Sequence, residues 1–272
     1  MNYDILYTDI DGTLLRNDKT VSERVLQEMK SYIGKGGRIV LSSGRPLPAT
    51  VRVIGQLGLP TQNMYVIAFN GAAIYDVAAE QMIYEKRLPL SAVAAVLGLA
   101  EKNGIHCHTY TDDTVISQRD TPELHRYLEH IHMPYAIEPD IVSYLTSIGG
   151  YCPFKMLALT LNDRGALEKF ASTIHTHLGD QLHTFFSAPL YLECCMKEAS
   201  KGNAVSYLSD HLGIEISRTI AAGDAANDIS MLLAAGTSYA MQNATEDVKQ
   251  VAGYITVHSN NEDGILELFA RM

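Results

Sequence analysis

Short apolar runs alternate along the chain with longer stretches in which apolar residues recur at helical spacing. The first run, residues 5–7, leads into a polar turn around Gly12, and this pattern predicts a buried strand that ends in a tight turn. Residues 20–23 then have the form of a capping box, and apolar side chains recur three or four positions apart over residues 25–33. We therefore expect a helix that is ended by Gly36.

The alternation continues with a strand over residues 38–42, a short helix over 48–57 and a strand over 64–69. It returns near the C-terminal end with helices over 201–212, 228–235, 245–251 and 263–272, and with strands over 218–222, 238–241 and 254–257. Strands that alternate with helices predict a parallel sheet covered by helices on both faces. The expected core is of the α/β class, with a Rossmann-like, doubly wound parallel sheet.

The middle of the chain has a different pattern. Helical candidates lie at residues 91–103, 122–132 and 163–178, with strand-like runs at 105–110, 114–117, 154–161 and 182–186. The chain has 272 residues, more than a single domain usually has, which favours two domains. We expect the core to occupy residues 1–83 and 190–272, with an α/β domain inserted over residues 84–189.

Two carboxylates follow the first predicted strand. Asp9 and Asp11 are two positions apart, so in an extended segment their side chains point the same way. Carboxylates so close repel each other unless a cation lies between them or one of them holds a proton. A lone pair of this kind could simply cap a turn, but its position at the end of an apolar strand favours a metal site.

Polar groups also follow the second strand and begin a later helix. Ser43 and Gly44 could donate a hydroxyl and a backbone N–H to an anion, and ligands of open α/β sheets bind at this edge. Lys201 lies at a predicted helix start, where the helix dipole disfavours an ammonium unless an anion is near. The alternative for Lys201 is a solvated surface lysine.

A third apolar strand ends in Asp224, Asn227 and Asp228. Mg²⁺ prefers oxygen ligands and usually keeps several waters, so two or three protein oxygens suffice to bind it. Asp9, the backbone carbonyl of Asp11 and Asp224 could supply those oxygens. Asp228 could bind the ion directly or orient one of its waters, and Asn227 could donate to a phosphate.

Composition excludes several classes of protein. Apolar residues make up 47% and charged residues 19%, and 21 basic against 31 acidic residues give a net charge of −10. Without a Lys/Arg cluster we expect no nucleic-acid partner. No apolar stretch reaches the roughly 18 residues of a membrane span, and no secretory signal begins the chain, so we expect a cytoplasmic protein without a membrane partner. The four cysteines form no metal-binding pattern, and we expect reduced thiols.

These stretches, in this order, resemble the four motifs of haloacid dehalogenase-like hydrolases over nearly the whole chain. The details are similar to the Cof-type sugar-phosphatase subfamily: Asp9-Ile10-Asp11-Gly12-Thr13, Ser43-Gly44-Arg45-Pro46, Asn70-Gly71-Ala72, Ser200-Lys201-Gly202-Asn203-Ala204, Gly223-Asp224-x-x-Asn227-Asp228 and Ala240-Met241-x-Asn243-Ala244. The sequence departs from the subfamily pattern at Ala225-Ala226 and at Gln242, where no functional group is lost.

The resemblance implies a set of site residues. Phosphate would be bound by the backbone N–H groups of Ile10 and Gly44 and by the side chains of Ser43, Lys201 and Asn227. Mg²⁺ would be held by Asp9, Asp11 and Asp224, with Asp228 as a direct ligand or a supporting residue. The inserted α/β domain would be a cap that selects the substrate.

The function that this implies is a Mg²⁺-dependent phosphatase acting on small phosphorylated metabolites, sugar phosphates above all. Asp9 would attack phosphorus to form an aspartyl-phosphate, and a protonated Asp11 would donate to the leaving oxygen. Two alternatives stay open, a phosphomutase on the same scaffold and a non-catalytic sensor of phosphorylated metabolites. The sequence identifies neither the substrate nor the oligomeric state, monomer or homo-oligomer. Five side chains are candidates for determining substrate specificity: Arg45, His108, Tyr110, His183 and Tyr191.

Overall fold

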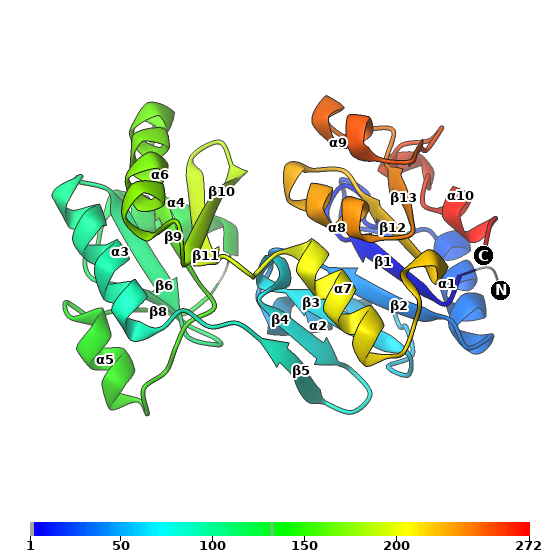
Figure 1. Ribbon diagram of the computed structural model, residues 1–272, viewed down its shortest axis with the longest axis horizontal. Helices are drawn as coiled ribbons and strands as arrows, with labels where there is room; N and C mark the ends of the chain where they lie inside the picture. The colour runs from blue at the N-terminus through cyan, green and yellow to red at the C-terminus, as the bar shows by residue number, and fades with distance from the viewer. Residues whose placement is uncertain (1–2, 132) are drawn as a thin grey trace. The chain divides into compact units, whose positions relative to one another are not determined.

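The computed structural model describes residues 3–131 and 133–272 and divides into two compact units (Figure 1). The first unit contains the chain up to Glu85 together with Ala199–Met272, and the second contains Lys86–Glu198. Residue 132, at the end of the predicted helix 122–132, and residues 1 and 2 of the predicted core lie outside the described part. Within that part, no helix is both long and apolar enough to span a membrane.

The first unit is built on an eight-stranded sheet with the order β14-β13-β12-β1-β2-β3-β4-β5. Neighbouring strands from β14 to β3 are parallel, whereas β3, β4 and β5 pair antiparallel. The strands are β1 Ile5–Asp9, β2 Arg38–Ser42, β3 Met64–Ala68, β4 Ala73–Asp76, β5 Gln81–Glu85, β12 Thr219–Gly223, β13 Thr237–Ala240 and β14 Tyr254–Ile255. The predicted parallel core is confirmed for the strands from β14 to β3.

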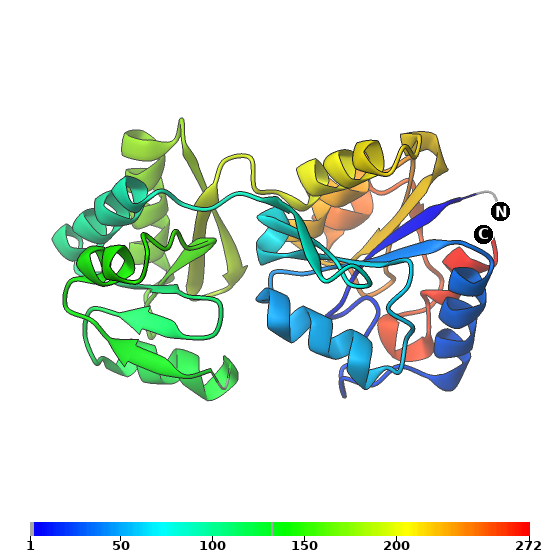
Figure 2. The same ribbon diagram turned by 90° about the horizontal axis from the view of Figure 1, so that it is seen from below.

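Helices cover both faces of this sheet, as the sequence predicted (Figure 2). On one face lie α1 Glu23–Gly34 and α2 Leu47–Gln56, with α10 Leu266–Phe269 beside α1; on the other lie α7 Lys201–His211, α8 Ile229–Ala234 and α9 Glu246–Val251. Every residue of β1 is buried, since side chains on both sides of the strand meet a helical layer. Ile5 and Tyr7 join the apolar cluster under α7 and α8.

Several boundaries differ from the sequence expectation. The hairpin β4–β5 was not predicted, because β5 is a partly exposed edge strand with little apolar signal. The cap of α1 is Ser22, whose side chain accepts from the N–H of Val25, and not Thr20 of the expected capping box, whose hydroxyl donates to Asp18. The strand and helix at the C-terminal end are shorter than predicted.

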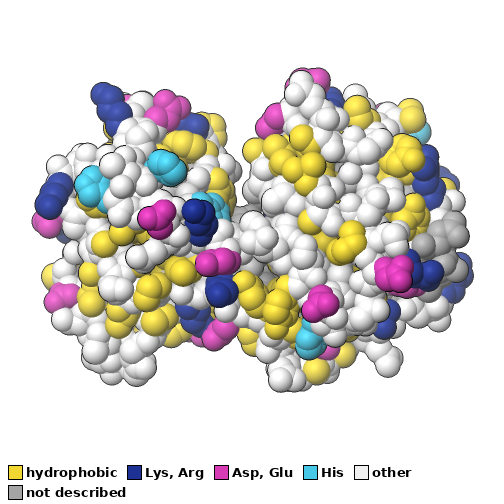
Figure 3. All heavy atoms as spheres, viewed as in Figure 1, with side chains coloured by type: hydrophobic (Ala, Val, Ile, Leu, Met, Phe, Trp, Pro, Cys, Tyr) yellow, Lys and Arg dark blue, Asp and Glu magenta, His cyan; other side chains and the backbone are white. Residues whose placement is uncertain are grey.

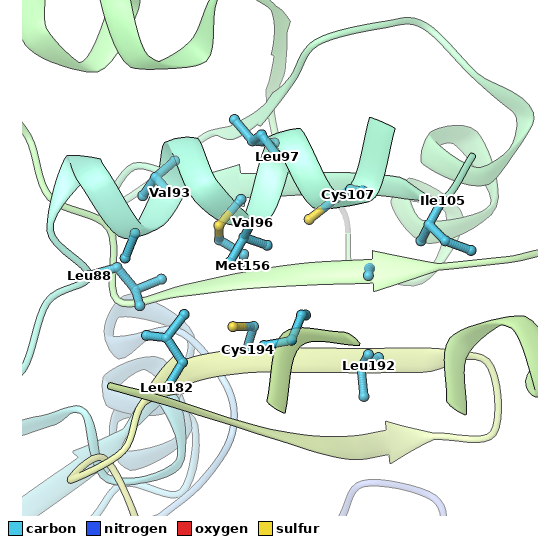
Figure 4. Close-up of a cluster of buried hydrophobic side chains, with 14 of the residues drawn as sticks. Leu88, Val93, Val96, Leu97, Ile105, Cys107, Met156, Leu182, Leu192 and Cys194 are labelled. Carbon is cyan, nitrogen blue, oxygen red and sulfur yellow. The ribbon is translucent and has the colours of Figure 1, made fainter. Parts of the chain in front are cut away.

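The second unit contains a six-stranded sheet with the order β10-β11-β9-β6-β7-β8. Its strands are β6 His106–Tyr110, β7 Val115–Ser117, β8 Tyr135–Ile137, β9 Lys155–Leu159, β10 Leu182–Ala188 and β11 Tyr191–Met196, and its helices are α3 Leu90–Lys102, α4 Pro122–Ile131, α5 Ile141–Ser147 and α6 Arg164–Leu178. Side chains from α3, β6, β9 and β11 meet in one apolar core (Figure 4). The second unit extends past the expected boundary at residue 189, because β11 pairs with both β9 and β10.

Candidate active site

The predicted site residues gather at the carboxyl edge of three neighbouring strands. Asp9 is the last residue of β1, Ser43 follows β2, and Asp224 follows β12, and these strands lie side by side in the order β12-β1-β2. The carboxyl ends of parallel strands point in one direction, which is why residues more than two hundred positions apart meet here.

Lys201 is the first residue of α7, and its side chain is buried, with 1% of the residue exposed. Its Nζ donates to Oδ1 of Asp9 at 2.7 Å and to Oδ1 of Asp228 at 2.6 Å. A third hydrogen bond, 3.1 Å long, reaches the carbonyl oxygen of Ser42. Lys201 is therefore an internal partner of two carboxylates and not the solvated lysine that the sequence left open.

Burial and repulsion between the carboxylates determine the pKa values of the groups around Lys201. Burial, with help from Asp228 and Asp224, raises the pKa of Asp9 to about 8 although Lys201 opposes the shift. Burial and Asp228 likewise raise the pKa of Asp224 to about 6. Burial alone would lower the pKa of Lys201, but Asp228 and Asp9 outweigh it and hold that pKa above its ordinary value. Three carboxylates thus lie close together while the ammonium contacts only two of them, and a divalent cation would neutralise the remaining charge.

The oxygen atoms of this cluster fit a hard cation. Asp9, Asp224 and Asp228 each offer a carboxylate oxygen within 4.8 Å of the others. Both oxygens of Asp228 already accept hydrogen bonds, Oδ1 from Lys201 and Oδ2 from the backbone N–H groups of Asp224 and Ala225 at 3.0 and 3.1 Å. This favours Asp228 as a support for the loop and for Lys201, and leaves Asp9 and Asp224 as the better ligands.

The turn after β1 is shaped to receive Asp224. Gly12 has a φ of +87°, and a Cβ at this position would lie 2.4 Å from Oδ2 of Asp224. Only glycine permits both the backbone conformation and the approach. Thr13 donates its hydroxyl to Oδ1 of Asp224 at 2.9 Å, so the two turns fix each other.

Asp11 lies apart from the carboxylate cluster and is paired with cations. Arg45 donates from Nε and Nη2 to its two oxygens at 2.8 and 2.6 Å, and Lys19 donates at 2.9 Å. Burial would raise the pKa of Asp11, but these hydrogen bonds lower it below the ordinary value. The protonated Asp11 expected from the sequence is therefore not the state that this arrangement stabilises, and proton donation requires Arg45 and Lys19 to release the carboxylate.

Polar groups suited to an anion line the edge beside Asp9. Ser43 is buried, and its Oγ accepts from the N–H of Arg45 at 3.2 Å, which leaves the hydroxyl proton to donate elsewhere. Asn227 donates from Nδ2 to Oδ1 of Asn70 at 2.9 Å. Ile10, whose backbone N–H is the expected donor to phosphate, directly follows Asp9 and is buried.

Sequence reasoning assigned no role to Thr13 or Asn70, which the structure brings into contact with the predicted residues. The signal for each was present but weak. Thr13 belongs to the Asp-Gly-Thr turn, and Asn70 to an Asn-Gly pair at the end of a strand, where such pairs usually mark a turn and nothing more.

Comparison with known proteins finds related sequences and a related fold. A family model described as haloacid dehalogenase-like hydrolase matches residues 6–269. The 5-amino-6-(5-phospho-D-ribitylamino)uracil phosphatase of Bacillus subtilis is 27% identical over 96% of this chain and 94% of its own length, and the HMP-PP phosphatase of Escherichia coli K12 is 25% identical over 93% and 90%. A haloacid dehalogenase-like hydrolase from Bacteroides thetaiotaomicron superposes with a TM-score of 0.85 at 30% identity, covering 99% of both chains.

Proposed function

The chain belongs to the haloacid dehalogenase-like hydrolases and is a phosphatase of that family, and from this premise we propose that it hydrolyses small phosphorylated metabolites, sugar phosphates among them, with Mg²⁺ as its cofactor. The single observation that carries the proposal is the buried group in which Lys201 joins Asp9 to Asp228 beside Asp224. A nucleophilic carboxylate, a neutralising ammonium and oxygen ligands for a cation stand together at one sheet edge.

In the proposed reaction, an oxygen of Asp9 bonds to phosphorus and the ester oxygen leaves. Lys201 opposes the rise in the pKa of Asp9 and orients its carboxylate, because the ammonium contacts one carboxylate oxygen and leaves the other for the attack. Asp9 and Asp224 would hold Mg²⁺, which when bound supplies positive charge to the phosphoryl oxygens. Ser43, Asn227 and the backbone N–H groups of Ile10 and Gly44 would donate to those oxygens.

Asp11 would donate a proton to the leaving oxygen and take one from the water that hydrolyses the aspartyl-phosphate. Because Arg45 and Lys19 bind the Asp11 carboxylate at 2.6–2.9 Å, we propose that this ion pair is a resting arrangement that opens when substrate binds. The ion pair is partly exposed, so water can solvate the separated charges when it opens.

The proposed substrate class is supported by the names of the relatives and by the presence of an inserted unit. The names of two relatives identify phosphorylated small molecules as their substrates. We propose that the inserted unit, Lys86–Glu198, acts as a cap that selects the leaving group. We propose a cytoplasmic enzyme with a small-molecule substrate and no nucleic-acid partner. On the face that Figure 3 shows, acidic and basic side chains are interspersed.

The experiment that tests this proposal is a panel of phosphorylated metabolites assayed with Mg²⁺, in which free phosphate is measured and ranked by kcat/KM. We expect release of inorganic phosphate, with sugar phosphates among the best substrates. Transfer of the phosphoryl group to a second hydroxyl of a hexose phosphate, without release of phosphate, would identify the enzyme as a phosphomutase instead of a phosphatase.

A further inference from the structure

The segment that follows β3, Phe69–Gly71, has an unusual backbone. Its three residues have consecutive positive φ angles of 51°, 55° and 102°, and only the last of them is a glycine. Left-handed conformations are uncommon for residues with a side chain, and they persist where the surroundings fix them, often at functional sites. Asn70 is also buried, with 4% of the residue exposed, so its amide is directed into the protein and not to solvent.

The backbone of this segment holds the turn that follows β2. The N–H of Asn70 donates to the carbonyl oxygen of Ser43 at 3.0 Å, and the N–H of Phe69 donates to that of Arg45 at 3.1 Å. A Cβ added to Gly44 would lie 2.9 Å from Nδ2 of Asn70, so the amide lies directly against the Gly44 backbone.

The segment also packs against the start of α7. A Cβ added to Gly71 would lie 2.1 Å from the carbonyl oxygen of Ser200, the residue before Lys201. The two predicted phosphate-binding stretches at β2 and α7 therefore contact one short segment that has no proposed role of its own.

The side chain of Asn70 reaches a third phosphate-binding residue. Nδ2 of Asn227 donates to Oδ1 of Asn70 at 2.9 Å. An asparagine amide is planar and carries two N–H groups on one nitrogen, so engaging one of them fixes the direction of the other and of the carbonyl. The acceptor on Asn70 thus determines which atoms Asn227 presents to an anion.

We propose that Asn70 is a positioning residue of the phosphate site, whose side chain orients the amide of Asn227. The hydrogen bond of its backbone N–H to Ser43 holds the neighbouring turn and is kept when glycine replaces Asn70. The inference rests on the proposed function, because it takes Asn227 as a donor to the phosphoryl group. A simple turn would need only the positive φ, which glycine adopts more readily than asparagine. A turn alone does not explain why the amide of Asn70 is buried between two predicted phosphate-binding stretches.

The test is a double-mutant cycle with an aryl phosphate as substrate and inorganic phosphate as inhibitor. Asn70→Gly keeps the left-handed backbone and removes the amide, and Asn227→Ala removes the donor. We expect each single variant to lose about tenfold in kcat/KM, the effect of one hydrogen bond, and to bind inorganic phosphate more weakly. The double variant should be no worse than Asn227→Ala, because Asn70 acts through Asn227.

The matched control is Asn63→Gly, which replaces another asparagine of positive φ, at 60°, at the opposite end of β3. It should leave kcat/KM and phosphate inhibition unchanged. If Asn70→Gly does not fold, Asn70→Ala also removes the acceptor oxygen for Asn227 and adds no charge, and it should weaken phosphate inhibition to the same extent.

The outcomes separate the inference from the proposed function. An unimpaired Asn227→Ala would overturn the phosphate-binding role of Asn227, and the inference with it. An impaired Asn227→Ala with an unimpaired Asn70 variant, or single losses that multiply in the double variant, would overturn the inference alone.

Discussion

Nζ of Lys201 lies 2.7 Å from Oδ1 of Asp9, across 192 positions of sequence that include the whole inserted unit. Both side chains are almost fully buried, so neither charge can turn to water if its partner is removed. This ion pair, shared with Asp228, holds the carboxylate of Asp9, the proposed nucleophile, at the sheet edge, so we expect activity and stability of the core to depend on the same contacts.

Lys201→Met should lose stability as well as activity. The variant leaves the carboxylates of Asp9 and Asp228 buried without a cation, which we expect to cost about 3–5 kcal/mol in the free energy of unfolding. Urea unfolding in metal-free buffer measures this loss. The double variant Lys201→Met with Asp228→Asn should recover part of the stability and none of the activity, and equal stability of the single variant and wild type would refute the buried ion pair.

Asp224→Asn should weaken metal binding while it stabilises the metal-free protein. Since burial and repulsion from Asp228 raise the pKa of Asp224 to about 6, its ionised form at neutral pH destabilises the folded protein when no cation is bound. We expect the variant to be more stable than wild type in chelator, by on the order of 1 kcal/mol. Mg²⁺ should raise the melting temperature of the wild type and have little effect on the variant.

The control for this comparison is Asp180→Asn, which removes an exposed carboxylate outside the cluster. It should keep the wild-type response to Mg²⁺. An equal Mg²⁺-dependent rise in Asp224→Asn would exclude Asp224 as a ligand.

The inserted unit should lose stability in mild acid because of His106. Burial lowers the pKa of His106 to about 4, from an ordinary value of 6.5. Between these values the unfolded chain binds a proton that the folded chain does not, so this contribution to stability is complete above pH 6.5 and is lost as pH falls toward 4. The loss approaches about 1.4 kcal/mol per pH unit for each such histidine.

His106→Gln should therefore reduce the fall in unfolding free energy between about pH 7 and pH 5 in a urea series. His177→Gln, at an exposed position of α6, is the matched control and should follow the wild-type curve. Parallel curves for His106→Gln and wild type would contradict the assignment.

Excision of Lys86–Glu198, with a short flexible linker in its place, tests the proposed cap. The remaining unit has its own sheet and apolar cluster, so we expect it to fold. An activated aryl phosphate needs little recognition and little protonation of its leaving group, and should suffer less than a sugar phosphate. The ratio of kcat/KM for the best sugar phosphate to that for the aryl phosphate should fall, and an unchanged ratio in a folded protein would mean that specificity lies in the core.

Local pattern was enough to predict the elements that carry the site. The strand over residues 38–42 has the predicted bounds, because a buried apolar run is followed directly by polar turn residues. The start of α7 at Lys201 was likewise predicted. The family resemblance then identified which polar residues at these ends would meet.

Pairings between distant side chains could not be predicted in the same way. β11 carries Glu193 in its middle, and only the fold shows that Lys155 neutralises it at 3.0 Å. The contact of Asp11 with Arg45 is of the same kind, and it reverses the protonation expected for Asp11. Such contacts depend on which strands become neighbours, which the sequence pattern does not state.

The central claim is that Asp9 is the nucleophile, and trapping the phosphorylated enzyme tests it most directly. Enzyme quenched in acid during turnover of a phosphate ester with Mg²⁺ should yield a peptide containing Asp9 that is heavier by one phosphoryl group. Asp9→Asn should stay folded, show no labelled peptide and keep less than roughly one per cent of kcat. A phosphoryl group on another residue, or substantial turnover by Asp9→Asn, would contradict the account.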